Sequence, residues 1–196
     1  MGYDFYWNGS KSPGTNELVG IQAGLQKVVV YDSNGCALAL SIDLKEPTRL
    51  KGTVDSVIDV RCFNESNGRL YASATGGLKN YRFIWTDTFN TEITQGSKLD
   101  GVKAGFYKLV VKDRNGCVDS VKQIYEVLQP EPISVDLLDQ MKITCYNGAN
   151  GKMRVGAKGG NGGYQYEWLT WPNSTKDSFV ENLGAGKYVL NVTDSR

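Results

Sequence analysis

The stretch LDGVKAGFYKLVVKDRNGC at residues 99–117 decides the fold that the sequence encodes. Tyr107, Leu109 and Val111 lie two residues apart, with lysines on the alternate positions around them. A period of two is the pattern of a β-strand that has one buried face. The Asn-Gly pair that follows suits a tight turn, because both residues tolerate positive φ. The stretch therefore predicts a half-buried strand that ends in a hairpin turn.

The same stretch occurs three times in the 196 residues. It matches LVGIQAGLQKVVVYDSNGC at residues 18–36 and VENLGAGKYVLNVTDSR at residues 180–196. Two other blocks recur with it: YDFYW, YRFIW and YQYEW at residues 3–7, 81–85 and 164–168, and VRCFNESNGRLYASATGG and ITCYNGANGKMRVGAKGG at residues 60–77 and 143–160. A spacing of about 82 residues is the length of a small domain. We predict a partial first repeat in residues 1–46, a complete central repeat in 47–130 and a third repeat in 131–196 that lacks its last strand.

Within one repeat, the pattern predicts several short strands and no helix. Tyr81, Phe83 and Trp85 share one face of a strand, and residues 118–127 form a further strand. Prolines, which cannot donate a hydrogen bond to a sheet, mark the exits from the repeats. Short strands, a tryptophan on an aromatic strand and a Gly-x-Tyr before a late strand resemble an immunoglobulin-like sandwich. The predicted fold is therefore all-β, with tandem immunoglobulin-like β-sandwich modules.

This resemblance gives the repeated aromatic residues structural roles. Trp85 and Trp168 take the place of the core tryptophan, and Tyr107 and Tyr188 that of a corner tyrosine. Gln26 stands at the corresponding position of the first repeat. Alternation already accounts for these aromatic residues as core, so we do not assign them to a ligand platform.

Composition excludes several classes of function. The 22 basic and 21 acidic side chains leave no charge excess to attract nucleic acid. No run of 18 apolar residues is present, so no membrane insertion is expected. Histidine is absent, which removes the commonest general base and metal ligand. The acidic residues are scattered, so we expect no enzyme and no cofactor.

The ordered set of motifs resembles the SprB-type repeat of Bacteroidota cell-surface adhesins that serve gliding motility. Its pieces are CFNESNG, ATGG, YRFIW and KAGFYKLVVKDRNGC in the central repeat, and CYNGANG, AKGG, YQYEW and GAGKYVLNVTD in the third. The resemblance implies a secreted protein that uses the type IX route, is displayed extracellularly at the outer membrane, and acts in cell adhesion or gliding. Asn80 and Gly163 stand where the family usually has proline, which leaves the subfamily open.

The four cysteines fit an exported protein, but their pairing stays open. Cys36 and Cys117 follow the Asn-Gly turn, whereas Cys62 and Cys145 precede a Gly/Asn-rich turn. Four cysteines allow three pairings. The alternatives are a bridge within a repeat, bridges between neighbouring repeats, and partners that lie beyond the ends of this chain.

The turn sequences also suggest a cation site as an alternative to a purely turn-forming role. Asp32 and Asn34 in the first repeat, and Asp113 and Asn115 in the central one, offer oxygen ligands of the kind that calcium prefers. A full calcium loop carries more carboxylates at fixed spacing, so turn formation is the favoured interpretation.

Two non-catalytic functions follow from these patterns. In the first, the repeats are a stalk or spacer whose partners are neighbouring repeats of the same protein. In the second, the repeats bind a surface glycan or protein through the loop after the Trp strand, which differs in every repeat and holds Phe89 and Trp171.

Overall fold

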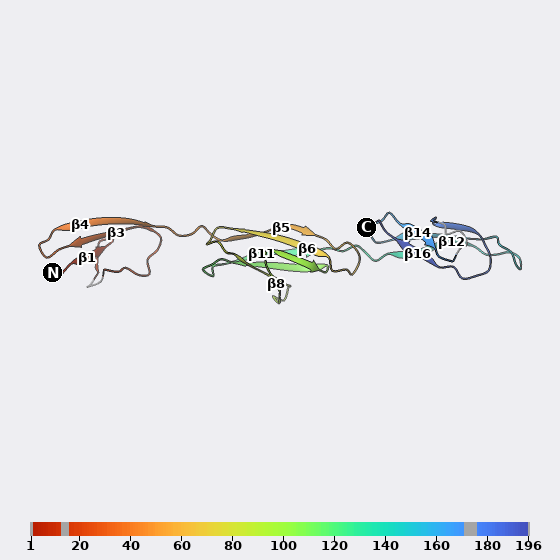
Figure 1. The fold of residues 1–196 in the computed structure, drawn as a ribbon, viewed down its shortest axis with the longest axis horizontal. Helices are drawn as coiled ribbons and strands as arrows, with labels where there is room; N and C mark the ends of the chain where they lie inside the picture. The colour runs from red at the N-terminus through yellow and green to blue at the C-terminus, as the bar shows by residue number, and fades with distance from the viewer. Residues whose placement is uncertain (1, 13–15, 171–175, 196) are drawn as a thin grey trace. The chain divides into compact units, whose positions relative to one another are not determined.

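A computed structural model describes residues 2–12, 16–170 and 176–195, which divide into two units, residues 1–49 and 50–196. Every regular element in these described ranges is a β-strand (Figure 1). The described part of the chain contains no helix of the length and apolarity needed to cross a membrane. The predicted all-β fold is therefore confirmed.

The central repeat forms a two-sheet sandwich from seven strands. One sheet has the order β5-β6-β9 and the other β11-β10-β7-β8, with antiparallel pairing throughout. The strands are β5 (Lys51–Ile58), β6 (Gly68–Thr75), β7 (Arg82–Thr86), β8 (Glu92–Gln95), β9 (Lys98–Val102), β10 (Gly105–Lys112) and β11 (Val118–Val127). Three strands against four, in this order, is an immunoglobulin-like arrangement.

The core of the central repeat lies between its two sheets, where alternate residues of facing strands meet. Its fully buried side chains come from both sheets: Leu70, Trp85, Leu99, Leu109, Val111 and Val127. The alternation that the sequence shows in β10 is confirmed, because Tyr107, Leu109 and Val111 are buried while Lys108 and Lys112 are half-exposed on the other face. Burial of these apolar faces is the main force that holds the sheets together.

The third repeat follows the same plan over its described residues. Its sheets have the orders β12-β13-β15 and β14-β16. The strands are β12 (Ser134–Met141), β13 (Gly151–Lys158), β14 (Gln165–Trp168), β15 (Phe179–Leu183) and β16 (Leu190–Thr193). The register shift between Leu137 and Asp139 matches the shift between Val54 and Ser56 in the central repeat. The repeats thus share even their irregular pairing.

The first repeat is a single sheet with the order β2-β1-β3-β4. Its strands are β1 (Asp4–Trp7), β2 (Ser10–Ser12), β3 (Gly24–Tyr31) and β4 (Ala37–Leu44), and they correspond in order to β7, β8, β10 and β11. Trp7 pairs with Val28 as Trp85 pairs with Leu109 and Trp168 with Leu190. One register therefore recurs in all three repeats.

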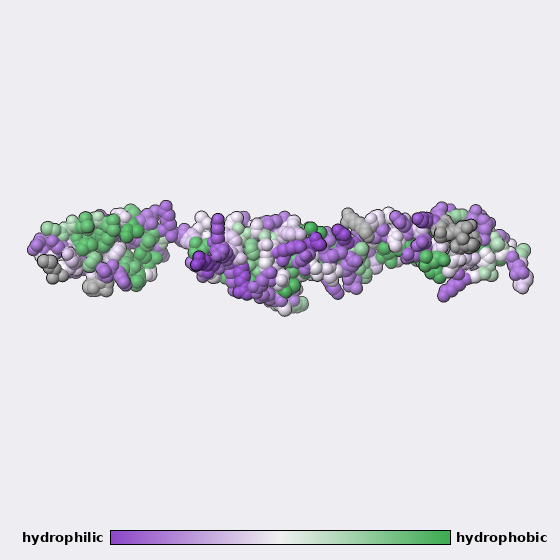
Figure 2. Space-filling model, viewed as in Figure 1, coloured by the Kyte–Doolittle hydropathy of each residue, from purple (hydrophilic) through white to green (hydrophobic). Residues whose placement is uncertain are grey.

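The first repeat leaves apolar side chains of its sheet open to solvent. Every residue of β4 is exposed, including Leu38 and Leu40. Figure 2 shows this as a green surface over the N-terminal unit. In the central repeat the strand β11, at the corresponding position, contacts β5 of the opposite sheet. Among its described residues, the first repeat thus has only the sheet that corresponds to β11-β10-β7-β8 of the central repeat.

Candidate functional site: the hairpin loop and the repeated residues

The loop after the Trp strand of the central repeat is a hydrogen-bonded hairpin between β7 and β8. The amide of Asp87 donates to the Thr91 carbonyl at 3.1 Å. The Asp87 carboxylate accepts from the amides of Phe89 and Thr91 at 2.9 and 2.8 Å. Lys108 Nζ donates to the Thr88 carbonyl at 2.9 Å and so ties the turn to β10. Hydrogen bonds within the turn and a hydrogen bond from the neighbouring strand β10 therefore stabilise one conformation of the turn.

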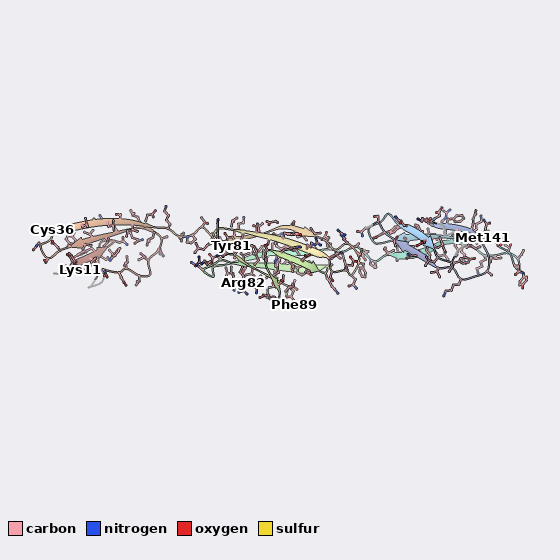
Figure 3. All side chains as sticks on the ribbon, viewed as in Figure 1. Lys11, Cys36, Tyr81, Arg82, Phe89 and Met141 are labelled. Carbon is pink, nitrogen blue, oxygen red and sulfur yellow. The ribbon has the colours of Figure 1, made fainter. Side chains whose placement is uncertain are left out.

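Phe89 lies at the tip of this hairpin, and its ring has no cover from the rest of the repeat. It is 87% exposed, and it projects from the lower edge of the central repeat in Figure 3. A large apolar ring on an ordered turn is available for stacking on a sugar or a protein surface. Trp171, the other candidate, lies outside the described residues, so its role stays a prediction.

The two core tryptophans have the same environment in their repeats. Trp85 is fully buried and Trp168 is 3% exposed. Trp85 Nε1 donates to the carbonyl of Gly96 at 2.9 Å, and Trp168 Nε1 donates to the carbonyl of Asp177 at 3.0 Å. Both acceptors lie just before a strand of the opposite sheet, which is β9 in the central repeat and β15 in the third. Neither indole is accessible to a ligand.

The tyrosines before the late strand form the same contact in two repeats. The Tyr107 hydroxyl donates to the carbonyl of Lys103 at 2.8 Å, and the Tyr188 hydroxyl donates to that of Gly184 at 2.8 Å. Burial raises the pKa of the Tyr107 hydroxyl, as expected for a structural phenol. In the first repeat, Gln26 Nε2 donates to the Gln22 carbonyl, also four residues earlier, at 3.2 Å. The glutamine thus makes the hydrogen bond that tyrosine makes elsewhere.

Sequence reasoning missed a second repeated tyrosine contact. The Tyr81 hydroxyl donates to the Gly76 carbonyl at 2.7 Å, and the Tyr164 hydroxyl donates to the Gly159 carbonyl at 2.5 Å. Both acceptors belong to the Gly-Gly pair that closes the preceding strand. The constant five-residue offset between tyrosine and glycine was the available signal.

Asp113 is buried, and its carboxylate accepts hydrogen bonds from the backbone around it. Its carboxylate accepts from the amides of Leu78, Asn115 and Cys117 at 3.0, 2.9 and 2.9 Å. These hydrogen bonds hold the pKa of the Asp113 carboxyl below its usual value, and the one from the Leu78 amide has the largest effect. Asp32 accepts from the amides of Asn34 and Cys36 in the same way.

The turn geometry supports a turn-forming role for these carboxylates. Each aspartate closes its own loop through amide donors, which competes with a cation for the same oxygens. Within the described ranges, no group of three or more Cys, Asp or Glu side chains is arranged to hold a metal ion. The calcium site stays an untested prediction.

The four cysteines form no disulfide with one another in the structure. Cys36, Cys117 and Cys145 are exposed, whereas Cys62 is half-buried. Cys117 precedes β11 directly, and the amide of Val60, close to Cys62, donates to the Leu128 carbonyl just after β11. Ten residues of strand separate these points, which corresponds to roughly 30 Å. A bridge between Cys62 and Cys117 would need Cα atoms within about 7 Å, so the geometry opposes it.

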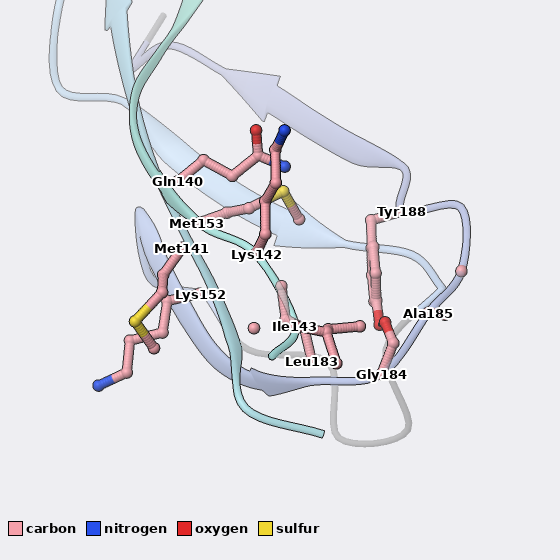
Figure 4. Close-up of a pocket in the computed structure, with 12 residues that line it drawn as sticks. Gln140, Met141, Lys142, Ile143, Lys152, Met153, Leu183, Gly184, Ala185 and Tyr188 are labelled. Carbon is pink, nitrogen blue, oxygen red and sulfur yellow. The ribbon is translucent and has the colours of Figure 1, made fainter. Parts of the chain in front are cut away.

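The third repeat has a groove of about 320 Å³ next to Ile143, Gly151, Leu183 and Tyr188 (Figure 4). In the central repeat, the position of Gly151 is taken by Gly68. A Cβ on Gly68 would lie 2.7 Å from Cγ1 of Val127, the last residue of β11. The groove of the third repeat thus lies where the central repeat packs its own last strand. It is a packing surface of the fold rather than a ligand pocket.

Comparison with known proteins adds a family to this geometry. A family model described as the SprB repeat matches residues 54–88 and 138–172. No curated protein matches the chain. Among solved structures, the chain is similar to a crystal structure of Dpr2 Ig1-Ig2 in complex with DIP-Theta Ig1-Ig3. The identity is 10% and the TM-score 0.32, over 89% of this chain and 72% of that one.

Proposed function

Because residues 54–88 and 138–172 match the family model of the SprB repeat, we propose that this chain is a non-catalytic stalk segment of a cell-surface adhesin. The segment contributes length between the cell and a binding region elsewhere in the protein. In this proposal the protein is exported by the type IX route and held at the outer membrane, where it acts in adhesion or gliding. Neighbouring repeats of the same protein are its main partners.

One observation supports a structural role above all others: the residues that recur are used in folding. The indole of Trp85, the hydroxyl of Tyr107 and the carboxylate of Asp113 all bond to the backbone of their own repeat. Their counterparts in the third repeat, Trp168 and Tyr188, do the same. A repeated active site would need side chains that point to a substrate. Repeated packing instead gives a chain of similar modules, in which each module adds stability and length.

A second candidate function is binding through the hairpin between β7 and β8. The observation that favours it is Phe89, an exposed aromatic ring on an ordered turn. Loops on a rigid sandwich are common positions for recognition. The corresponding loop of the first repeat, NGSKSPGTNE, has no aromatic residue, so this function would belong to individual repeats rather than to all of them.

Replacing Phe89 by alanine separates the two functions. For a stalk we expect no change in binding to a glycan array or to host cells, and a change in the free energy of unfolding within about 0.5 kcal/mol. Phe106→Ala is a matched control, because Phe106 is also an exposed phenylalanine of the central repeat but lies on β10. Binding that Phe89→Ala abolishes and Phe106→Ala preserves would establish the hairpin as a recognition site and contradict the pure stalk.

A further inference from the structure

The Asp-x-x-Gly-Cys turn places its cysteine in the same way in both repeats that contain it. In the first repeat, the Asp32 carboxylate accepts from the Cys36 amide at 2.8 Å, and the Asp32 amide donates to the Cys36 carbonyl at 3.0 Å. In the central repeat, Asp113 and Cys117 make the same two contacts at 2.9 and 3.0 Å. The position of the aspartate therefore determines where the cysteine lies.

The third repeat contains the start of the same turn at Asp194. The Asp194 carboxylate accepts from the amide of Asn161 at 2.7 Å, as the Asp113 carboxylate accepts from the amide of Leu78. A Cβ on Gly160 would lie 2.6 Å from Asp194 Oδ2, and a Cβ on Gly77 would lie 2.7 Å from Asp113 Oδ2. The two aspartates thus occupy equivalent positions. A Gly-Cys pair after Arg196 would complete the turn. The amide of that cysteine would then donate to the Asp194 carboxylate, as the Cys117 amide donates to the Asp113 carboxylate.

Asp194 lies next to the backbone that carries Cys62 of the preceding repeat. Asn161 Nδ2 donates to Asp194 Oδ2 at 3.0 Å and to the carbonyl of Arg61 at 2.8 Å. Cys62 follows Arg61 directly. Burial raises the pKa of the Cys62 thiol, and the negative charges of the Glu65 and Asp194 carboxylates raise it further. One amide side chain therefore connects the turn of one repeat with the cysteine segment of the repeat before it.

Equivalent residues of the central and third repeats differ in exposure, as expected if the third repeat covers part of the segment around Cys62. Cys62 is half-buried, whereas Cys145, its counterpart in the third repeat, is exposed. The next residues behave in the same way, since Phe63 is 49% exposed and Tyr146 is 95% exposed. Cys62 and Phe63 are thus partly covered in the central repeat, which the third repeat follows.

We propose that Cys62 forms a disulfide with the cysteine that ends the Asp-x-x-Gly-Cys turn of the following repeat, so that consecutive repeats are covalently linked at their junction. The two thiols lose two protons and two electrons to form one S–S bond. Oxidised glutathione or a dithiol oxidase of the export compartment takes up both, and is itself reduced to two thiols. This link goes beyond the stalk function and does not depend on it. It would resist bending or separation of repeats under load.

A chain extended by Gly-Cys after Arg196 tests the proposal directly. After oxidation with glutathione and digestion without reductant, mass spectrometry should find the Cys62 peptide joined to the appended cysteine in most of the monomeric protein. The chain that ends at Arg196 should give no intramolecular disulfide under the same conditions. In the extended chain, Cys62→Ser should abolish the joined peptide, whereas Cys145→Ser should leave it in place.

Far-UV circular dichroism of each variant establishes that the fold is retained before the peptides are compared. A folded extended chain in which the appended cysteine stays a thiol would overturn the proposal. So would pairing of that cysteine with Cys117 or Cys145, or a Cys62–Cys117 bridge in place of the junction link.

Discussion

Replacing Trp85 by alanine is expected to lower the free energy of unfolding of the central repeat by about 3 to 5 kcal/mol. The side chain is completely buried between the two sheets, and its Nε1 donates to the Gly96 carbonyl. Alanine would leave a cavity and an unsatisfied carbonyl, and both are unfavourable. Hydrogen exchange of peptides from residues 50–128, measured by mass spectrometry, reports this repeat separately from the others.

The matched control for this experiment is Phe89→Ala, which removes an aromatic ring that is exposed to solvent. Its effect on exchange should be within about 0.5 kcal/mol. If Trp85→Ala were as mild as Phe89→Ala, the indole would not be part of the core, and a ligand-binding role for the repeated tryptophans would have to be reconsidered.

Replacing Gly77 by alanine is expected to destabilise the central repeat by about 2 to 4 kcal/mol, through two separate effects. Gly77 has a φ of 55°, where a Cβ is unfavourable. The new Cβ would also lie 2.7 Å from Asp113 Oδ2, the oxygen that accepts from the Leu78 amide at 3.0 Å. The carboxylate would have to move and lose that hydrogen bond. Urea denaturation followed by circular dichroism measures the combined loss.

Gly116→Ala isolates the contribution of the backbone. Gly116 has a φ of 81°, but a Cβ there would meet no atom within 4 Å. We expect this variant to lose only about 1 to 2 kcal/mol. Equal losses for the two glycines would show that the contact with Asp113 is not important for the fold.

The sequence predicted the parts of the fold that depend on alternation and on repetition. The strand at residues 118–127 was predicted with the bounds that β11 has, and the buried face of β10 follows the Tyr107, Leu109 and Val111 pattern. Trp85 and Tyr107 have the packing and the corner hydrogen bond that the immunoglobulin-like resemblance implied. These residues are constrained by burial, and burial leaves a strong periodic signal.

Other strands were not predicted, because their residues are mostly exposed and carry no clear period. β8 and β12 are edge strands of this kind, and β8 lies within the segment that the sequence pattern indicates as a loop. The partners of the cysteines could not be obtained from sequence either, since pairing depends on which turns meet at a junction. The Asn161 side chain shows which turns meet, because its hydrogen bond to the Arg61 carbonyl joins residues that are 100 positions apart in the sequence.

The candidate site was predicted only in part for a similar reason. A phenylalanine in a variable loop is visible in the sequence, but the exposure of Phe89 and the Asp87 turn that holds it in place require coordinates. The substitution of Gln26 for tyrosine was visible as a departure from the repeat. Its physical meaning, a hydrogen bond to the carbonyl four residues earlier, comes from the structure.

Small-angle X-ray scattering of head-to-tail concatemers of residues 47–130 tests the stalk proposal most directly. With two, four and six copies, a stalk predicts a radius of gyration that rises in proportion to copy number, because each repeat contacts only its neighbours. A radius that grows more slowly, with an exponent near about 0.6 as for a flexible chain, would contradict the proposal.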